Sequence, residues 1–330
     1  MAKESLRVGV VGMGKMGLLH SGLINVLPDT KLTVACEPAN LTRRLLKKAL
    51  PKVPVVKDVS EMSKYDLDAL FITTPTRTHY DVCKTALQNG IAHNLFVEKP
   101  LSGSYQSSIE LSNMMSSSGI GLVGYVRRFM VTFLKARELL KQGLIGDPTS
   151  FSLNLVSSDF CGVKDPAVSI NRGGVLKDLG CYAIDLILWY FGDFQVDSAS
   201  AQSLTGPGAV DAVQFKVLDK NAVPPGNVFV SWCVEGYRMP EADFSIVGSK
   251  GKISVNDDFV KLDVEGNSST FYRLNLNDIT PFWLGAPEYF REDEAFAKAV
   301  KNGGIVEPSF ASAAKVELQI DELERRFNQK

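Results

Sequence analysis

The sequence predicts an α/β fold: an N-terminal doubly wound parallel sheet followed by a C-terminal α+β domain built on a large, mostly antiparallel sheet. The chain has 330 residues, which suits two domains better than one. Up to residue 124, short apolar runs alternate with amphipathic stretches, which is typical of a parallel sheet with helices on both faces. From residue 125 onward, strand-like segments meet at turns rich in glycine, asparagine and aspartate. We therefore place the domains at 1–124 and 125–330.

In the first half, short apolar runs predict strands, and apolar residues at helical spacing predict the helices between them. The helix after the first strand, for example, has Met16, Leu19 and Leu23 on one face. The predicted strands are 6–11, 32–36, 67–73, 95–97 and 120–124. The predicted helices are 15–27, 42–50, 79–88 and 105–117, and the serines at 116–118 are expected to end the last helix in a turn.

The second half begins with a predicted helix at 129–141 and then changes rhythm. In the strand at 151–155, Phe151, Leu153 and Leu155 alternate with polar residues, so one face of this sheet is expected to meet water. Further predicted strands are 212–218, 227–234, 244–247, 252–255, 260–264 and 270–276. A long apolar helix at 177–191 interrupts them, and helices at 287–301 and 309–327 close the chain.

Composition and charge argue against several classes of protein. Lys and Arg number 36 and Asp and Glu number 37, so the formal net charge is −1 and gives no basic field for nucleic acid or a membrane surface. The five cysteines form no CxxC pair and the three histidines all lie in the first half, so we expect neither a disulfide framework nor a metal site. No apolar run approaches the roughly 18 residues that span a bilayer, and the N-terminal residues do not resemble a signal peptide. We therefore expect a cytoplasmic protein.

A glycine-rich motif, GMGKMG at residues 12–17, stands between the first strand and the first helix. Gly12 permits a tight turn, Gly14 lets the backbone approach a pyrophosphate, and Gly17 lets the helix pack closely on the strand. The N-terminus of the helix, with Lys15 and Met16 in its first turn, then offers free N–H groups to the phosphates. In this context the motif predicts a dinucleotide-binding Rossmann domain over residues 1–124.

Glu37 bears on which dinucleotide is expected. It lies 20 residues beyond Gly17, at the end of the second predicted strand, where an acid accepts hydrogen bonds from the ribose hydroxyls. A carboxylate there repels a 2′-phosphate, so NAD is the preferred cofactor. Arg43 and Arg44 follow on the next helix. Either they reach a 2′-phosphate, which leaves NADP as an alternative, or they are solvated helix charges.

Further motifs follow in order: Thr74-Pro75 and then His79, the triplet EKP at 98–100, and the stretch GGVLKDLGCYAID at 173–185. With these motifs the chain resembles the glucose–fructose oxidoreductase / inositol dehydrogenase / rhizopine-catabolism (Gfo/Idh/MocA) family over most of both domains. The resemblance implies an NAD(P)-dependent oxidoreductase acting on sugars, cyclitols or related alcohols. It also implies that the sheet of the second domain serves as an oligomer interface. We therefore expect a homo-oligomer, dimer or tetramer, with a small polar molecule as substrate.

The resemblance also implies roles for individual residues. Lys99 takes the position of a lysine that contacts both the nicotinamide ribose and the substrate hydroxyl. Many relatives carry a histidine four residues after the aspartate of the helix motif, whereas here Tyr182 follows Asp178, as in some other relatives. The remaining residues expected along the cofactor edge of the sheet are Thr74, Pro75, His79 and Glu98.

The residues themselves support part of this interpretation. Lys99 follows the carboxyl end of a parallel strand, where doubly wound folds bind their ligands. Asp178, Tyr182 and Asp185 are spaced i, i+4 and i+7 on a mostly apolar helix, so we expect them to share one face. Further candidate substrate contacts are Tyr125, Arg128, Arg172 and Asp185. Either of the two arginines could equally pair with a structural carboxylate.

We therefore predict a dehydrogenase or reductase in which hydride passes between a substrate carbon and C4 of nicotinamide. Lys99 would stabilise charge on the substrate oxygen, Tyr182 would exchange the proton, and Asp178 would support them. The alternative is a non-catalytic dinucleotide-binding protein with a regulatory or redox-sensing role. Such a protein would keep the glycine motif but would need neither Lys99 nor the polar helix face.

Two expectations concern residues outside these motifs. His20, inside the first helix, is expected to be a packing residue. Phe229, Trp232 and Phe244 lie in predicted strands of the second domain and are apolar candidates for an oligomer interface, because the sheet has many strands beside few helices. The sequence leaves open which face of the sheet each occupies, and Trp232 is expected in the core or at the interface.

Overall fold

The computed structural model describes residues 5–115, 119–220, 223–282 and 284–328, so the predicted serine turn at 116–118 lies outside the described residues. The chain forms two compact units. The first consists of Met1–Val126 and Thr280–Glu317, and the second of Arg127–Ile279 and Leu318–Lys330. The first change of unit falls two residues after the boundary placed at 124/125. The return of residues 280–317 to the first unit differs from the single boundary predicted from the sequence.

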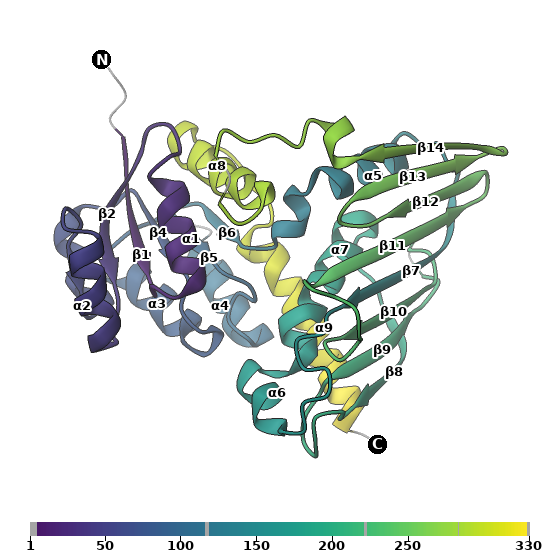
Figure 1. The fold of residues 1–330 in the computed structure, drawn as a ribbon, viewed down its shortest axis with the longest axis horizontal. Helices are drawn as coiled ribbons and strands as arrows, with labels where there is room; N and C mark the ends of the chain where they lie inside the picture. The colour runs from purple at the N-terminus through teal and green to yellow at the C-terminus, as the bar shows by residue number, and fades with distance from the viewer. Residues whose placement is uncertain (1–4, 116–118, 221–222, 283, 329–330) are drawn as a thin grey trace. The chain divides into compact units, whose positions relative to one another are not determined.

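The first unit is built on a six-stranded parallel sheet with the order β3-β2-β1-β4-β5-β6 (Figure 1). The strand order reverses between β1 and β4, which places the topological switch point of the fold there. A doubly wound parallel sheet is therefore confirmed. The strands are β1 (Leu6–Val11), β2 (Thr30–Cys36), β3 (Val55–Val56), β4 (Ala69–Ile72), β5 (Leu95–Val97) and β6 (Gly121–Val123).

Two helices of this unit come from segments that are far apart in the sequence. α8 packs on α1, where Leu23, Leu27 and Phe290 form a buried cluster that also takes in Leu19 and Tyr289. Burial of this apolar surface explains why the late segment belongs to the first unit. The helices are α1 (Lys15–Ile24), α2 (Asn40–Ala49), α3 (His79–Gln88), α4 (Tyr105–Met115) and α8 (Pro287–Asn302), with short 3-10 turns η1 (Val59–Tyr65) and η2 (Thr76–Thr78).

The second unit is built on an eight-stranded sheet with the order β14-β13-β12-β11-β7-β10-β9-β8 (Figure 1). Neighbouring strands are antiparallel except for β7 and β10, so the predicted large, mostly antiparallel sheet is confirmed. The strands are β7 (Pro148–Val156), β8 (Val196–Gln202), β9 (Ala212–Val217), β10 (Gly226–Ser231), β11 (Glu241–Gly248), β12 (Gly251–Val255), β13 (Phe259–Val264) and β14 (Asn267–Tyr272).

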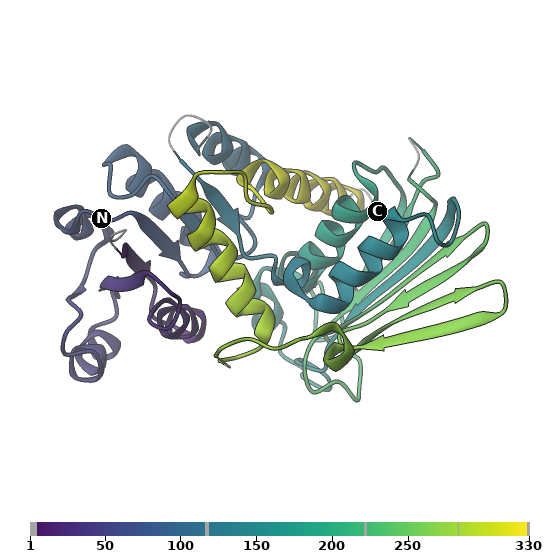
Figure 2. The same ribbon diagram turned by 90° about the horizontal axis from the view of Figure 1, so that it is seen from above.

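Helices cover one face of this sheet (Figure 2). α5 contacts β12 and β13, and α7 contacts β7. The helical segments are η3 (Val126–Phe129), α5 (Val131–Lys141), α6 (Pro166–Arg172), the π-helical turn η4 (Leu176–Gly180), α7 (Cys181–Phe191) and η5 (Arg273–Leu276). The last helix, α9 (Phe310–Asn328), belongs to the first unit up to Glu317 and to the second unit from Leu318. The predicted helix at 177–191 thus begins with a π turn, and the last four residues of the predicted strand at 270–276 form η5 instead.

The other face of the sheet is polar where β7, β9 and β10 meet. Phe229 lies there, in register with the exposed residues Asn154 and Gln214. Trp232 and Phe244, in contrast, are buried within the unit, with 0% and 1% of their surface exposed. Trp232 is therefore the core residue that one of its two interpretations predicted, and Phe244 is not an interface residue, because its side chain already fills the core.

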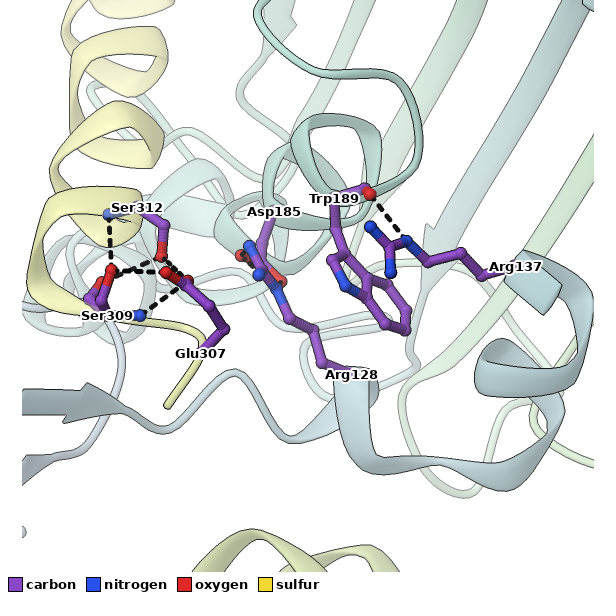
Figure 3. A network of polar contacts seen from close by, with 7 residues as sticks. All are labelled: Arg128, Arg137, Asp185, Trp189, Glu307, Ser309 and Ser312. Carbon is purple, nitrogen blue, oxygen red and sulfur yellow. Dashed lines mark hydrogen bonds and ion pairs between the residues drawn. The ribbon is translucent and has the colours of Figure 1, made fainter. Parts of the chain in front are cut away.

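α9 begins next to a short polar network (Figure 3). The Glu307 carboxylate accepts hydrogen bonds from the Ser309 N–H at 2.9 Å, the Ser309 hydroxyl at 2.8 Å and the Ser312 hydroxyl at 2.7 Å. These bonds satisfy donors at the start of the helix. None of the helices in the described part of the chain is long and apolar enough to cross a membrane.

Candidate functional site

The glycine turn after β1 has the geometry that each of its glycines requires. Gly12 adopts a φ of +89°, and its N–H donates to the Cys36 carbonyl at 2.9 Å. A Cβ on Gly17 would lie 2.0 Å from the Gly12 carbonyl oxygen, so only glycine lets α1 approach the turn this closely. A Cβ on Gly14 would meet no atom of the described residues within 4 Å. Gly14 therefore leaves open space on the side where the motif predicts a pyrophosphate.

Gly14 is also the N-cap of α1. No side chain caps the helix there, and its first turn contains no acidic residue. The first N–H groups of a helix lack intrahelical partners and carry partial positive charge, so this end suits an anionic group. Lys15 is exposed and Met16 is half-buried in the same turn.

Glu37 follows the end of β2 and is 8% exposed. Its carboxylate accepts hydrogen bonds from the Met13 N–H at 3.0 Å and from the Ala39 N–H at 2.7 Å. The carboxylate therefore holds the glycine turn as well as standing where a ribose is expected. A carboxylate can accept about four hydrogen bonds, so two bonds leave capacity for ribose hydroxyls.

The two arginines of α2 occupy different environments. The Arg43 guanidinium donates to the carbonyl oxygens of Glu37 and Pro38, each at 2.8 Å, and to the side chain of Asn40 at 2.5 Å. Arg44 is exposed. Arg43 thus fastens the segment after β2, and a role with a 2′-phosphate would require it to give up these bonds.

Thr74 and Pro75 follow β4, beside the glycine turn. A Cβ on Gly12 would come within 2.8 Å of Thr74, and the hydroxyl of Thr73 donates to the Gly12 carbonyl at 2.7 Å. The carboxyl ends of β1 and β4 are therefore in direct contact, as the switch point requires.

His79 lies behind these turns and is 1% exposed. Its Nδ1 is 2.9 Å from the Pro100 carbonyl oxygen, and its Nε2 is 2.7 Å from the Thr74 carbonyl oxygen. Burial lowers the pKa of His79. The ring ties the turn after β4 to the turn after β5, and neither nitrogen is free to exchange a proton with a substrate.

Glu98, Lys99 and Pro100 follow β5 at the same edge of the sheet, with a cis peptide bond between Lys99 and Pro100. Lys99 is half-buried, and its N–H donates to the Glu98 carboxylate at 3.2 Å. Glu98 is 9% exposed, and its other carboxylate oxygen lies 3.1 Å from Nε2 of His20. Glu98 therefore points into the unit.

His20 differs from the packing residue that the sequence predicts. Its Nδ1 lies 2.8 Å from a carboxylate oxygen of Asp293 in α8, so it belongs to a polar network rather than to simple packing. Burial opposes a charge on this ring, but attraction and hydrogen bonds to Asp293 and Glu98 outweigh burial and raise the pKa of His20 to about 10. Asp293 lies far away in the sequence, so no local pattern could reveal the pair.

In the second unit, Asp178 and Tyr182 lie on η4 and on the first turn of α7. A carboxylate oxygen of Asp178 is 3.6 Å from the Arg172 guanidinium, which also pairs with Asp159 at 2.9 Å. The structure thus brings together two predicted site residues, Asp178 and Arg172. π-helical turns are rare and occur frequently at functional sites.

Arg127, which the sequence analysis did not single out, is the cation beside Tyr182. Its guanidinium carbon lies 5.9 Å from the centre of the Tyr182 ring. It also pairs with Asp257 and donates to the Pro240 carbonyl at 2.9 Å. Arg127 and Arg128 are adjacent in the sequence, and only the structure shows which of them lies by the tyrosine.

Arg128 and Asp185 form a buried ion pair (Figure 3). The guanidinium donates from Nε at 2.9 Å and from Nη2 at 2.6 Å, and the two residues are 7% and 1% exposed. Trp189 lies against Arg128, and its carbonyl accepts a bond from Arg137 at 2.9 Å. The predicted polar face is therefore divided, because the Asp185 carboxylate is committed to Arg128. The pairing of Arg128 with a structural carboxylate, the alternative to a substrate contact, is therefore the arrangement observed.

Two further candidates complete the comparison with the sequence. Tyr125 has no exposed surface, whereas the Arg172 side chain is 46% exposed. Among the residues that the structure describes, no group of three or more His, Cys, Asp or Glu side chains could hold a metal ion.

The fold and the glycine turn define a two-domain protein with an N-terminal dinucleotide-binding unit, and comparison with known families gives the same answer. Residues 6–125 match the family described as "Oxidoreductase family, NAD-binding Rossmann fold", and residues 133–254 match the "GFO/IDH/MocA C-terminal domain". Together these matches span more than half of the chain, so the chain belongs to the Gfo/Idh/MocA oxidoreductase family. Its N-terminal unit is an NAD-binding Rossmann domain.

Individual relatives are distant. The scyllo-inositol 2-dehydrogenase (NAD(+)) of Bacillus subtilis (strain 168) is 27% identical over 63% of this chain and 58% of its own length. The inositol 2-dehydrogenase of Rhizobium meliloti (strain 1021) is 24% identical over 92% of each chain. A solved structure of levoglucosan dehydrogenase in complex with NADH and levoglucosan aligns with a TM-score of 0.86 at 21% identity, over 99% of this chain and 98% of that one. This last likeness shows a shared fold.

Proposed function

We propose that this protein is an NAD-dependent dehydrogenase or reductase of a sugar, a cyclitol or a related alcohol or ketone. Family membership supports the redox class, and the names of the inositol and levoglucosan dehydrogenases support a polyhydroxylated substrate. One observation carries the proposal: Lys99 follows β5 at the edge of the sheet where β1 and β4 also end, so a cation stands at the ligand-binding edge of an NAD-binding fold.

The described residues fit a bound NAD. Gly14 leaves open space at the uncapped N-terminus of α1, which suits a pyrophosphate. Glu37 offers a carboxylate where the ribose is expected, and Arg43 is engaged with backbone carbonyls. These features favour NAD over NADP. When bound, the nicotinamide ring accepts or supplies the hydride.

We assign the charge-stabilising role to Lys99. Oxidation of an alcohol removes a proton from oxygen while hydride leaves carbon, so negative charge develops on that oxygen. An ammonium group positioned there stabilises this charge in a site that excludes water. The peptide N–H of Lys99 is bonded to the Glu98 carboxylate, which fixes the backbone from which the side chain extends.

We assign the proton exchange to Tyr182. A free phenol, with a pKa of about 10, is a poor base near neutral pH, but a nearby cation favours the phenolate. The Arg127 guanidinium supplies such a cation within the second unit, 5.9 Å from the ring centre. We assign a supporting role for Lys99 and Tyr182 to Asp178 in η4, whose carboxylate lies 3.6 Å from the Arg172 guanidinium.

Substitution of Lys99 and Tyr182 tests this assignment. Sugars and polyols are first screened with NAD by nicotinamide fluorescence, and the responding compound becomes the substrate. Lys99→Ala should lower turnover about 10²–10⁴-fold with NADH binding nearly intact. Tyr182→Phe keeps the ring and should cause a loss of similar or smaller size, whereas Lys52→Ala, an exposed lysine of the first unit, should have no effect.

The contrary outcomes are distinct. Full turnover by Tyr182→Phe, with chemistry shown to be rate-limiting, would remove the tyrosine from the reaction. NADH binding without turnover of any screened compound would instead favour a non-catalytic, redox-sensing protein.

We also propose a homo-oligomer, dimer or tetramer, that assembles through the polar face of the eight-stranded sheet, and a cytoplasmic location. Helices cover only one face of that sheet, which leaves the other for water or a partner (Figure 2). All five cysteines are free thiols, which is typical of a reducing compartment.

A further inference from the structure

A cluster of ionisable side chains lies inside the first unit, directly behind the turn that carries Lys99. We name it the acid–histidine cluster; it consists of His20 in α1, Glu98 after β5, and Glu292 and Asp293 in α8. His20, Glu292 and Asp293 have no exposed surface, and Glu98 is 9% exposed. The roles assigned above to Lys99 and Tyr182 leave these four residues unexplained.

His20 bridges two carboxylates. Its Nδ1 lies 2.8 and 2.9 Å from the two oxygens of Asp293, and its Nε2 lies 3.1 Å from an oxygen of Glu98. A neutral imidazole has one N–H, whereas both nitrogens here face carboxylate oxygens. The arrangement is satisfied when the ring carries both protons and donates in both directions.

The surroundings of the ring exclude water. Phe71 and Phe96 lie with their ring centres 5.5 and 4.8 Å from that of His20, and Tyr289 meets it edge-on at 6.3 Å. A buried charge is tolerated only when it is paired and hydrogen-bonded. The two carboxylates provide both conditions, so the ring holds its second proton well above neutral pH.

The link to the reaction runs through Glu98. One oxygen of Glu98 faces His20, and the other accepts the N–H of Lys99 at 3.2 Å. We propose that His20 is a positioning residue for the reaction: as a doubly protonated ring held by Asp293, it fixes the Glu98 carboxylate, which in turn fixes the backbone of Lys99. This inference rests on the proposed role of Lys99.

Glu292 is the fourth residue of the acid–histidine cluster. Among the residues that the structure describes, neither carboxyl oxygen of Glu292 has a hydrogen-bond partner. Burial together with Glu98, Asp293 and Glu288 raises the pKa of Glu292 well above its ordinary value. Burial therefore favours the protonated form of Glu292. The groups that face His20 are thus the carboxylates of Glu98 and Asp293, with Glu292 and Glu288 on the same helix as Asp293. Burial and the charge of Glu98 raise the pKa of Asp293, whereas His20 lowers it.

The protonation state of His20 can be observed directly and without a substrate. The chain has three histidines, so a ¹⁵N-histidine NMR spectrum of the whole protein contains the signals of three rings. The signals that disappear in His20→Gln are those of the His20 ring. We expect the wild-type His20 ring to carry protons on both nitrogens between about pH 6 and 9. A ring that is neutral at pH 7 would overturn the proposal.

Kinetics test whether the cluster positions Lys99. His20→Gln should lower kcat about 10–100-fold, the size of effect that misplacing a reacting group produces, with NADH affinity nearly unchanged. His93→Gln replaces an exposed histidine of the same unit and should match the wild type. His20→Gln also removes a cation from the side of Glu98 opposite Lys99, so the pH profile of its turnover should differ from that of the wild type.

The outcomes separate this inference from the proposed function. Full turnover and a wild-type pH profile in His20→Gln, beside a collapse in Lys99→Ala, would refute the positioning role alone. Full turnover in Lys99→Ala would refute the role of Lys99 itself. If His20→Gln fails to fold, Asp293→Asn provides the same kinetic comparison, and the NMR measurement on the wild type still decides the protonation state.

Discussion

The carbonyl oxygen of Gly12 lies 2.0 Å from the position that a Cβ on Gly17 would occupy, whereas a Cβ on Gly14 would meet no atom within 4 Å. These two glycines can therefore be separated experimentally. Gly14→Ala should leave the free energy of unfolding nearly unchanged and abolish NADH binding, because the added methyl group enters only the space for the pyrophosphate. Gly17→Ala should reduce both stability and binding.

Urea unfolding and NADH fluorescence titration of the two variants make the comparison. Tight NADH binding by Gly14→Ala would place the pyrophosphate elsewhere. Unchanged stability of Gly17→Ala would mean that α1 can move away from the turn at little cost.

The contacts of Glu37 predict the dinucleotide preference. NADH should bind about tenfold or more tightly than NADPH, because placing a phosphate against a carboxylate costs on the order of 1–3 kcal/mol. Glu37→Gln should reduce this preference for NADH over NADPH. It should also weaken the binding of NADH, because the Glu37 carboxylate accepts the Met13 N–H of the glycine turn. Dissociation constants for both cofactors test this, and equal or tighter NADPH binding by the wild type would point to Arg43 or Arg44.

The Arg128–Asp185 pair predicts a loss of stability rather than of substrate affinity. Arg128→Met removes the guanidinium from the buried Asp185 carboxylate, which should cost about 3–5 kcal/mol in urea unfolding. Arg172→Met breaks a pair that is largely exposed and should cost about 1 kcal/mol or less. A stable Arg128→Met protein with a raised KM would return Arg128 to the substrate site.

The acid–histidine cluster predicts how stability depends on pH. In the folded state Glu292 has a raised pKa, so it keeps a proton that the unfolded chain releases above about pH 4.3, and the free energy of unfolding falls as pH rises. His20 adds a second such proton between its ordinary pKa of 6.5 and about 10. Each proton contributes a slope of about 1.4 kcal/mol per pH unit.

Urea midpoints between about pH 5 and 9 measure these slopes. Glu292→Gln mimics a neutral acid and should reduce the slope at the acidic end of the range, to which Asp293 also contributes because burial raises its pKa. His20→Gln should remove the additional slope above neutrality. A wild-type slope retained in both variants would assign the titration to other groups.

The open face of the eight-stranded sheet predicts an assembly. Light scattering at micromolar concentration should give at least twice the chain mass of 36.1 kDa. Phe229→Glu places a charge among polar residues on that face and should shift the protein toward the monomer. A wild-type monomer would contradict the assembly, and an oligomer unaffected by the substitution would place the interface elsewhere.

Local patterns predicted most of the fold. The alternation of strands and helices identified five of the six parallel strands, because buried strands are continuous apolar runs. β8 was missed because its sequence, VDSASAQ, is polar and mostly exposed, and β3 has only two residues. The return of 280–317 to the first unit depends on apolar packing between α1 and α8, which no local pattern records.

The candidate site was predictable where function depends on position along a strand. Gly12, Glu37 and Lys99 follow strand ends, so their common edge could be inferred from topology. It was not predictable where partners are distant in sequence. Asp185 looked like part of a polar helix face until Arg128 was found beside it, and His20 looked like a packing residue until Asp293 was found.

The packing of α8 on α1 also determines when the first unit can be completed during synthesis. The six parallel strands leave the ribosome early, but Phe290 and Asp293 emerge only after all eight strands of the second sheet. Domains usually fold in order from the N-terminus during synthesis, but here the first unit cannot be completed before the second has been synthesised. Until α8 appears, a nascent chain exposes the apolar surface of Leu23 and Leu27 and lacks the partner of His20. That interval is the stage of synthesis at which we expect the protein to depend most on protection from aggregation.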